Sequence, residues 1–329
     1  MGSLKWGLIG AGDIARKRVA PALRDLPSCD LVSVSRSRAD LAESFANEFG
    51  VPKWFADWRD QMSDDEIEAV YIATPVYLHA QQTIAAAKAG KHVLCEKPMG
   101  LSARECDEMI AACQANNVKL GIAYYRRFYP AAIRAKEIID SGEIGKVSVA
   151  QINAFEFFDP PADDPRRWLL DKTRSGGGPM IDFGCHRVEV LMNLLGQIGR
   201  VEGMTSNAAF GREVEDTALA LLHFENECCA TITVSHASIE PRDTLEIYGT
   251  KGSIHIPVLN KGDMTVMAGG TARSEQLPTA VNVHEPLIED FTDAVLNRRE
   301  PTISGHVGRE VNLVIEQIYG SALAAEVRP

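Results

Sequence analysis

Lys97 is the first residue of this sequence whose type and setting suggest chemistry. It lies in Glu96-Lys97-Pro98, directly after the apolar run at 92–96. A residue before proline does not continue a regular element, so an extended turn or a cis bond would fix the direction of the ammonium group. An ammonium group held in this way can stabilise an alkoxide or share its proton. The alternative is a surface lysine in front of a loop proline.

Asp182 and His186 form a second candidate pair. They are four residues apart at the start of a helix expected at 179–195, so they share one helix face. Imidazole titrates near neutral pH, which makes His186 the better proton carrier and Asp182 the group that orients it. The alternative is a buried histidine satisfied by Asp182. The other seven histidines show no metal-ligand spacing, so no metal is predicted.

The stretch Gly10-Ala11-Gly12-Asp13-Ile14-Ala15 has the GxGxxA form of a dinucleotide-binding turn. It follows an apolar strand pattern at 4–9 and opens a helix, which is the context that this motif requires. Gly10 permits the tight turn and Gly12 allows the backbone to approach a pyrophosphate. The helix N-terminus at Asp13 and Ile14 offers free N–H groups. The alternative is a plain tight turn.

The end of the next strand indicates which dinucleotide is bound. The sequence there is Ser35-Arg36-Ser37-Arg38, where NAD-specific proteins usually carry an acidic residue. Hydroxyl and guanidinium groups can bond a 2′-phosphate that a carboxylate would repel. Ser35, Arg36 and Arg38 therefore favour NADP(H). NAD(H) stays possible because Asp40 is close enough along the chain to bind a ribose.

The first third of the chain alternates short apolar strands with helices. Strands are expected at 4–9, 30–35, 69–74, 92–96 and 118–123. This order predicts an α/β fold in which residues 1–124 form a Rossmann domain, a doubly wound parallel sheet that binds NAD(P). Ser102 and Glu105 predict a helix-capping box. Pro21 should kink or shorten the first helix.

Residues 125–329 show longer alternating strands separated by glycine turns such as YGTKGS. Strands are expected at 147–157, 200–209, 214–225, 228–236, 244–257 and 263–268, and helices near 179–195, 284–297 and 307–325. This pattern predicts an α+β domain with one large mixed or antiparallel sheet and helices on one face. We expect it to bind substrate, and its C-terminal helix is free to pack back on the first domain.

The composition is that of an ordinary soluble globular protein. Of 329 residues, 45% are apolar and 24% charged, and a net charge of −11 leaves no basic surface for nucleic acid or anionic lipid. No apolar stretch is long enough to span a membrane and no cleavable leader is recognised, so a cytoplasmic location is predicted. Seven cysteines without CxxC spacing predict reduced thiols. The expected partner is therefore a small molecule.

Six segments spread over the chain read GLIGAGDIA, ATPVYLHAQQTIAAAKAGKHVLCEKPM, YYRRFYP, SGGGPMIDFGCH, LEIYGTKGSI and FTDAVLNRREPTISGHVGREV. Together they resemble the glucose-fructose oxidoreductase, inositol dehydrogenase and rhizopine catabolism (Gfo/Idh/MocA) family. The resemblance implies a Rossmann domain followed by a mixed-sheet domain whose open face builds homodimers or homotetramers. It also implies hydride transfer at a carbinol carbon, with Lys97, Asp182 and His186 as the catalytic set.

The resemblance implies roles for further residues. Thr74, Pro75 and His79 would line the cofactor, and Glu96 and Lys97 would approach its nicotinamide ribose. With the two turns included, the expected cofactor-binding residues are Gly10, Gly12, Asp13, Ile14, Ser35, Arg36, Arg38, Thr74, Pro75, His79, Glu96, Lys97, Arg127 and Trp168. The expected substrate-binding residues are Tyr125, Arg126, Trp168, Asp182, His186 and His284. The sequence departs from the family pattern at Val76, where Asn is usual, and at Leu169, where Arg is frequent.

The sequence thus predicts an NADP(H)-dependent oxidoreductase acting on a carbinol or carbonyl carbon of a sugar, anhydrosugar, cyclitol or related polyol. The opening WGLIGAG-like strand and the Ser/Arg turn most resemble the anhydrofructose-reductase, aldose-dehydrogenase and dihydrodiol-dehydrogenase branch. Three alternatives stay open. They are an NAD-dependent inositol or sugar dehydrogenase, a redox-neutral NAD(P)-assisted lyase or glycosidase, and a dinucleotide sensor without activity. A sensor would not need Lys97, Asp182 and His186, so it is the least expected of the three.

Overall fold

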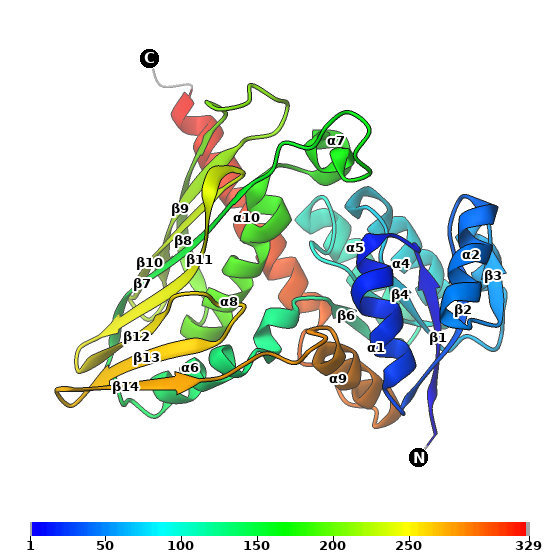
Figure 1. Cartoon of the computed structure of the whole chain (residues 1–329), viewed down its shortest axis with the longest axis horizontal. Coiled ribbons are helices and arrows are strands. Elements are labelled where there is room, and N and C mark those ends of the chain that lie inside the picture. The colour runs from blue at the N-terminus through cyan, green and yellow to red at the C-terminus, as the bar shows by residue number, and fades with distance from the viewer. Residues whose placement is uncertain (1, 327–329) are drawn as a thin grey trace. The chain divides into compact units, whose positions relative to one another are not determined.

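The computed structural model describes the backbone of residues 2–326 and the side chains of residues 2–323. Within it the chain divides into two compact units. Unit 1 runs to Tyr125 and also contains Ala280–Asn312. Unit 2 comprises Arg126–Thr279 and the chain from Leu313 onwards. Each unit is built on its own β-sheet (Figure 1).

Unit 1 contains a six-stranded parallel sheet in the order β3-β2-β1-β4-β5-β6. The strands are β1 (Leu4–Ile9), β2 (Cys29–Ser35), β3 (Lys53–Phe55), β4 (Ala69–Ile72), β5 (His92–Cys95) and β6 (Leu120–Ile122). This order confirms the predicted doubly wound sheet. The strand order reverses between β1 and β4, and open α/β sheets bind ligands at the carboxyl ends of strands at such a point.

The successive strands of unit 1 are connected by helices α1 (Ala20–Asp25), α2 (Ala39–Phe49), α3 (Trp58–Met62), α4 (His79–Lys88) and α5 (Ala103–Ala115), with a 3-10 turn at Val76–Leu78. Unit 1 also contains α9 (Glu285–Leu296) and the first part of α10 (Gly305–Glu326), and a 3-10 turn at Tyr125–Phe128 leads from it into unit 2. α9 packs on β1, where the rings of Trp6 and Phe291 lie 5.6 Å apart. Unit 1 is thus completed by a segment that follows unit 2 in the sequence.

Two local predictions in unit 1 concern helix ends and breaks. Pro21 lies in the first turn of α1, and the turn before it, Ala15–Val19, is π-helical, so the helix changes its geometry at this proline and continues to Asp25, and the kink stays a prediction. The capping box of α5 is confirmed. The hydroxyl of Ser102 accepts from the N–H of Glu105 at 3.2 Å. The Glu105 carboxylate returns a bond to the N–H of Leu101 at 2.8 Å, one residue before the position of the standard box.

Unit 2 contains an eight-stranded mixed sheet in the order β14-β13-β12-β11-β7-β10-β9-β8. The strands are β7 (Val147–Phe157), β8 (Ile198–Ser206), β9 (Thr217–Phe224), β10 (Cys229–Ser235), β11 (Ala237–Gly249), β12 (Gly252–Ile256), β13 (Asp263–Ala268) and β14 (Thr271–Gln276). Strands β7 and β10 pair in parallel at the centre, and the described neighbours around them pair antiparallel. The predicted large mixed sheet is confirmed.

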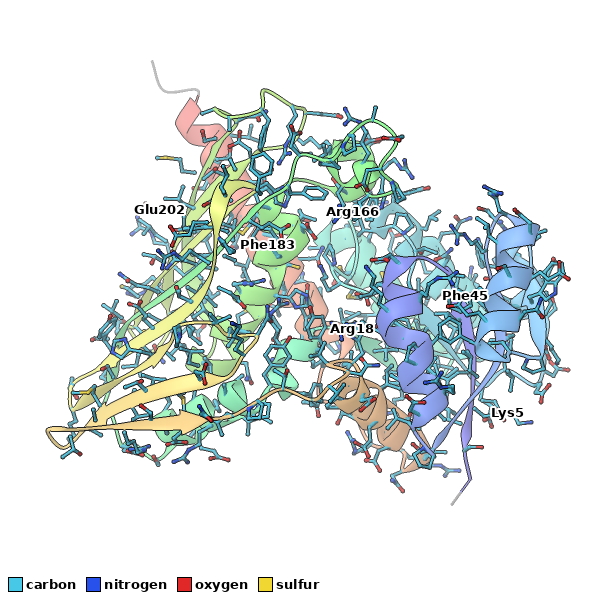
Figure 2. All side chains as sticks on the ribbon, in the orientation of Figure 1. Lys5, Arg18, Phe45, Arg166, Phe183 and Glu202 are labelled. Atoms are coloured by element: carbon cyan, nitrogen blue, oxygen red, sulfur yellow. The ribbon has the colours of Figure 1, made fainter. Side chains whose placement is uncertain are left out.

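The helices of unit 2 lie on one face of this sheet (Figure 1). They are α6 (Pro130–Asp140), α7 (Lys172–Ser175), α8 (Cys185–Leu195) and the later part of α10, with a 3-10 turn at Arg167–Leu170 and a π turn at Met180–Gly184. Burial alternates along β9, where Ala218, Ala220 and Leu222 are buried while Leu219 and Leu221 are exposed. Glu202 marks the edge strand β8 (Figure 2). One face of the sheet is therefore covered and the other open.

Within residues 2–326, none of the helices is both long and apolar enough to cross a bilayer. The seven cysteines, all in the described part, are free thiols, as the sequence predicted.

Candidate functional site

Gly10 ends β1 in a backbone conformation that favours glycine. Its φ is +96°, and a Cβ there would lie 2.8 Å from the carbonyl oxygen of Ala73. Gly12 differs, because a Cβ built on it meets no atom within 4 Å. The N–H of Gly10 donates to the carbonyl oxygen of Ser35 at 3.0 Å, which ties the turn to the end of β2. The backbone at Gly12 is thus open to a ligand such as a pyrophosphate.

Guanidinium groups gather where β2 ends. Ser35 is buried, and among the described residues nothing hydrogen-bonds its hydroxyl oxygen. Arg36 donates to the carbonyl oxygen of Ala11 at 2.7 Å and so lies against the glycine turn. Burial lowers the pKa of Arg36, and the nearby charges of Arg16 and Arg38 lower it further. A buried hydroxyl without a partner in the described part of the chain and, next to it in the sequence, an arginine on the glycine turn with Arg16 and Arg38 near it, suit an anionic ligand.

The acidic residues of this region are already paired. Asp40 accepts from the guanidinium of Arg38 at 2.5 Å, and this hydrogen bond holds the pKa of Asp40 below its usual range. Asp13 pairs with Lys17 at 3.0 Å on the exposed side of the turn, and Ile14 beside it is half-buried. Asp40, the carboxylate that could bind the hydroxyl groups of a ribose, is therefore paired with Arg38.

His79 joins the loops that follow β4 and β5. Its ring is buried, with Nε2 2.8 Å from the carbonyl oxygen of Thr74 and Nδ1 3.0 Å from that of Pro98. The hydroxyl of Thr74 donates to Gln82 at 2.6 Å, and Pro75 begins the short turn between β4 and α4. Burial lowers the pKa of His79 although both carbonyls oppose this. His79 thus fixes the spacing of the Thr74 and Lys97 loops.

Glu96 is a buried carboxylate at the carboxyl end of β5. It accepts from the Tyr71 hydroxyl at 2.9 Å and from the N–H of Lys97 at 3.2 Å, and His284 Nε2 lies 3.4 Å away. Burial alone would raise the pKa of Glu96, but His284, Lys97 and Tyr71 together hold it below its usual range. The ring of Tyr125 lies 4.6 Å from that of His284. Tyr71 is a member of this cluster that the sequence pattern does not reveal, because it lies in an apolar strand.

The side chain of Lys97 is half-buried next to Glu96. The Lys97-Pro98 peptide bond is cis, one of the two turn forms predicted from the sequence. The ammonium group is therefore carried by a backbone that Glu96 and His79 hold on either side.

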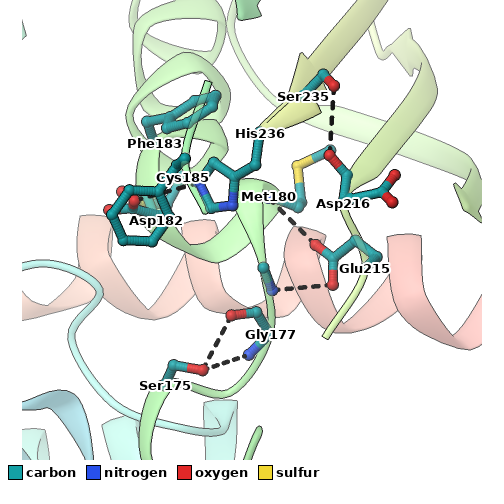
Figure 3. A network of polar contacts seen from close by, with 12 residues as sticks. Ser175, Gly177, Met180, Asp182, Phe183, Cys185, Glu215, Asp216, Ser235 and His236 are labelled. Atoms are coloured by element: carbon teal, nitrogen blue, oxygen red, sulfur yellow. Dashed lines mark hydrogen bonds and ion pairs between the residues drawn. The ribbon is translucent and has the colours of Figure 1, made fainter. Parts of the chain in front are cut away.

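In unit 2, the glycine run before Asp182 packs too closely for side chains. A Cβ on Gly177 would lie 2.2 Å from the Tyr319 hydroxyl oxygen, and one on Gly178 would lie 2.1 Å from the carbonyl oxygen of Glu215. The Glu215 carboxylate accepts from the N–H of Gly178 at 2.9 Å and from that of Met180 at 3.3 Å (Figure 3). It also accepts from the Tyr319 hydroxyl at 2.7 Å. Glu215 thereby anchors the start of the segment that carries Asp182.

Asp182 and His186 lie in different kinds of helix. Asp182 is in the π turn Met180–Gly184 and is partly exposed, whereas His186 is buried in the first turn of α8. The helix expected over 179–195 is therefore present, with a π-helical first turn at Met180–Gly184. Glycines favour helix weakly, and contacts with Glu215 and Tyr319 decide the geometry there instead.

No sequence pattern identifies two residues that lie near Asp182. His236 Nε2 lies 3.4 Å from Asp182 Oδ2 (Figure 3), and Glu156 offers a third polar atom within 4.8 Å of both. Burial raises the pKa of Glu156, and the charge of Asp182 raises it further. His236 follows β10 and Glu156 lies in β7, so only the pairing of these two strands brings them together.

The remaining predicted residues lie elsewhere in unit 2. Arg127 pairs with the fully buried Glu189 of α8 at 2.5 Å, and Arg126 is itself buried. Trp168 is half-buried in the turn Arg167–Leu170. Arg187 donates to Asp243 and, at 3.0 Å, to the carbonyl oxygen of Phe183, so it holds the π turn (Figure 2 labels Phe183).

Unit 1 fits a dinucleotide on its own geometry. Gly10 has no room for a side chain, Gly12 is open, and the buried Ser35 hydroxyl lies beside Arg36. These features supply a close backbone approach for a pyrophosphate and cations for a ribose phosphate.

Comparison with known families agrees with this geometry. Residues 4–124 match the oxidoreductase family with an NAD-binding Rossmann fold, and residues 132–255 match the GFO/IDH/MocA C-terminal domain. The chain therefore belongs to the Gfo/Idh/MocA family of NAD(P)-dependent oxidoreductases. The resemblance drawn from the six sequence segments is confirmed.

Individual relatives act on several small hydroxylated compounds, to judge from their names. The 1,5-anhydro-D-fructose reductase of Ensifer adhaerens is 28% identical over 98% of this chain and 98% of its own. The trans-1,2-dihydrobenzene-1,2-diol dehydrogenase of Mus musculus is 34% identical over 78% of this chain and 75% of its own. The crystal structure of aldose-aldose oxidoreductase from Caulobacter crescentus, complexed with glycerol, has a TM-score of 0.90 at 26% identity over 98% of both chains. Both NAD and NADP occur in the names of other relatives.

Proposed function

We propose that this protein is an NADP(H)-dependent oxidoreductase acting on a carbinol or carbonyl carbon of a sugar, anhydrosugar, cyclitol or related polyol. The observation that carries the cofactor choice is the end of β2, where the buried Ser35 precedes Arg36, whose guanidinium donates to the glycine turn at Ala11, and Arg38 follows. We assign cofactor binding to residues 1–124 and substrate binding to residues 125–329.

The charge of the ribose turn favours NADP(H) over NAD(H). The charges of Arg16 and Arg38 both lower the pKa of Arg36 after burial, so these two guanidinium groups add positive charge near Arg36. Asp40, the carboxylate that would favour an unphosphorylated ribose, is bonded to Arg38. Each charge-assisted hydrogen bond to a phosphate contributes about 1.5–3 kcal/mol. The relatives' names include both cofactors, so the preference rests on these residues.

The substrate class follows from the relatives and from the residues proposed to meet it. Anhydrofructose reductase, dihydrodiol dehydrogenase and aldose-aldose oxidoreductase all carry names of hydroxylated or carbonyl compounds. Tyr125, Arg126, Trp168 and His284, proposed as binding residues, combine aromatic faces with polar atoms. Such side chains suit a ring that carries several hydroxyl groups.

We assign three residues to the proton transfer. A bound nicotinamide dinucleotide supplies or accepts the hydride. His186 gives or takes the proton at the substrate oxygen, since imidazole titrates near neutral pH. The Lys97 ammonium stabilises negative charge on that oxygen, and the Asp182 carboxylate accepts a hydrogen bond from a neighbouring substrate hydroxyl. Glu96 holds the Lys97 backbone and Glu215 holds the start of the Asp182 turn.

The first experiment is an absorbance assay with both cofactors. NADPH and NADH are tested against keto sugars, and NADP and NAD against aldoses, cyclitols and anhydrosugars. We expect a signal with NADP(H) and one substrate class. Product formation without a change in cofactor absorbance would favour a redox-neutral reaction instead. Cofactor binding without any product over the whole panel would overturn the proposed activity.

Variants of the ribose turn test the cofactor choice. We expect Arg36→Glu to weaken NADPH binding by roughly tenfold to hundredfold more than NADH binding, because it replaces a donor to the 2′-phosphate by a carboxylate, whereas the loss of the bond to Ala11 affects both cofactors alike. Titration calorimetry measures both affinities. Arg24→Glu, at an exposed position on α1, is the matched charge control and should change neither. Equal losses for the two cofactors would argue against a 2′-phosphate at this turn.

Variants of Lys97 and His186 test the catalytic assignment. We expect Lys97→Met and His186→Asn each to lower kcat by about 10²- to 10⁴-fold while NADPH affinity is kept. Lys88→Met, an exposed lysine at the end of α4, serves as control. Near-normal turnover in a well-folded Lys97 or His186 variant would refute the role of that residue.

A further inference from the structure

His236 lies in an unusually confined position for a histidine. Its ring is fully buried, with the rings of Phe158 and Phe183 at centroid distances of 5.0 and 5.2 Å. Its backbone N–H donates to the carbonyl oxygen of Asp216 at 2.8 Å, and its own carbonyl oxygen accepts from the backbone N–H of Phe158 at 2.8 Å. Neither the backbone nor the ring is free to turn, so each ring nitrogen faces a fixed neighbour.

Arg212 determines which ring nitrogen carries the proton. Its Nη2 lies 2.9 Å from His236 Nδ1, and its Nη1 donates to the carbonyl oxygen of Phe158 at 2.8 Å. A guanidinium group has donors and no acceptor, so Nδ1 must accept this hydrogen bond through its lone pair. The proton of the neutral ring is then on Nε2, the nitrogen that lies 3.4 Å from Asp182 Oδ2.

The segment that carries Arg212 is itself fastened. The buried Asp216 carboxylate accepts from the N–H groups of Ala209 and Phe210 at 2.8 and 3.1 Å. The guanidinium of Arg212 also lies 4.7 Å from the centre of the Phe210 ring. Arg212 is therefore held in place independently of His236.

We propose that His236 is a positioning residue for Asp182, kept by Arg212 as a neutral ring whose Nε2–H is directed at the Asp182 carboxylate. The inference rests on the proposed role of Asp182 in substrate binding. The 3.4 Å contact is not a hydrogen bond in this structure, because Nε2 has no hydrogen-bond partner among the described residues. Bonds in catalytic sites often shorten only in the complex with substrate. His236 thus maintains Asp182 as an ionised acceptor for a substrate hydroxyl.

The same geometry argues against a metal ion at this cluster. Glu156, Asp182 and His236 offer polar atoms within 4.8 Å of one another, a set that could otherwise bind a divalent cation. A cation would need the lone pair of His236 Nε2, but Arg212 already occupies that of Nδ1, and a neutral ring has only one. We therefore expect that a chelator does not lower the activity and that added Zn²⁺ or Mn²⁺ does not raise it.

Other charged groups also act on this carboxylate cluster. Glu156 has a raised pKa, first because of burial and then because of the Asp182 charge, while Arg187 and Arg166 oppose the shift. The titratable and charged groups that face Glu156, Asp182, His236 and Arg212 are Arg166, Arg187, Asp159, Glu215 and Asp216. The titrations of several groups would therefore contribute to a pH profile. The test must instead observe the protonation of the His236 ring directly.

The first test reads the tautomer without any substrate. Histidine is labelled with ¹⁵N, and long-range ¹H–¹⁵N correlation spectra distinguish Nε2–H from Nδ1–H, with His236→Gln used for assignment. We expect Nε2–H at pH 7. Arg212→Met should abolish this preference and Arg212→Lys, which keeps a donor, should preserve it. An Nδ1–H or doubly protonated ring in the unchanged protein would overturn the inference.

The second test separates positioning from structure. Gln can place an N–H donor where Nε2 lies, whereas Asn reaches only the Nδ1 position. We expect His236→Asn to lower kcat/KM about tenfold and to move the acid limb of its pH profile upward by about one unit, because the carboxylate loses a donor. His236→Gln should restore most of both. Equal profiles for the two variants would contradict the inference.

The two tests also keep the inference apart from the proposed function. If no substrate gives turnover with NADP(H), the proposed function fails. The NMR measurement of the His236 tautomer still shows whether Arg212 keeps the proton on Nε2. If turnover is found but the ring carries its proton on Nδ1, the inference fails and the proposed function stands.

Discussion

Gly10 and Gly12 belong to one turn but are surrounded differently, and this difference can be measured. Gly10 has a φ of +96° and no room for a Cβ, so Gly10→Ala should destabilise the fold by at least the 1–3 kcal/mol typical of backbone strain. Gly12 has open space around it. We therefore expect Gly12→Ala to keep the thermal midpoint while it weakens NADPH binding, since a methyl group would occupy the position of the pyrophosphate.

Thermal unfolding with and without NADPH distinguishes the two effects. Ligand binding to the folded state raises the midpoint, so the Gly12 variant should start at the wild-type value and show a smaller rise. Gly50→Ala, at a helix end with a φ of +68°, controls for strain away from the turn. An unchanged NADPH response in Gly12→Ala would mean that the cofactor does not approach this backbone.

At the same scale, the sequence shows some site residues and hides others. Gly10, Gly12 and Ser35 can be found because they lie at fixed offsets around one strand-turn-helix unit, where local geometry decides their role. His236 and Arg212 cannot, because Asp182, His236 and Arg212 lie in separate segments that meet only through the pairing of β7, β9 and β10. Side-chain partners across a sheet carry no spacing signal in the sequence.

At the scale of elements, α8 carries a buried charge that links stability to pH. Burial raises the pKa of Glu189 from 4.5 to about 7 although Arg127 opposes this. The folded chain thus keeps a proton that the unfolded chain releases between these values. The contribution to the free energy of unfolding is full below pH 4.5 and is lost as the pH rises through about 7.

Glu189→Gln should therefore become more stable relative to the unchanged protein as the pH rises from 5 to 8, by up to about 3 kcal/mol. Denaturant unfolding at several pH values measures the difference. Glu202→Gln, an exposed glutamate on β8, should give a difference that does not change with pH. If the free energy of unfolding of Glu189→Gln instead fell relative to that of the unchanged protein between pH 5 and 8, Arg127 would be keeping the carboxylate ionised.

Element prediction succeeded where apolar runs or capping residues are clear, and it failed where a strand is very short or a tight turn lies inside an apolar pattern. The central strands β1, β2 and β4 and the capping box of α5 have clear apolar runs or capping residues, and they were predictable. β3 has three residues, too few to show alternation. The expected strand at 244–257 is two strands, β11 and β12, because the YGTKGS turn reverses the chain within it.

At the scale of the whole molecule, the open face of the unit 2 sheet exposes large apolar side chains in neighbouring positions. Met204 lies opposite Leu219, and Val149 lies opposite Tyr248, so each pair points to the same face. These residues and Leu221 are between 37% and 64% exposed. Contiguous exposed apolar patches usually mark interfaces. We infer that this face joins copies of the chain in a homodimer or homotetramer.

A lysine in the middle of this face should prevent assembly. Leu221 is 58% exposed on β9, the strand next to the edge strand β8. Leu221→Lys should therefore lower the stability of the isolated chain only slightly, but it places a charge in the buried interface. We expect light scattering after gel filtration to show an oligomer for the unchanged protein and a monomer for this variant. Val281→Lys, at a residue of unit 1 that is 98% exposed, should leave the mass unchanged. A monomeric unchanged protein would contradict the inference. An oligomer that persists in Leu221→Lys would contradict it too, because the copies would then meet through a different face.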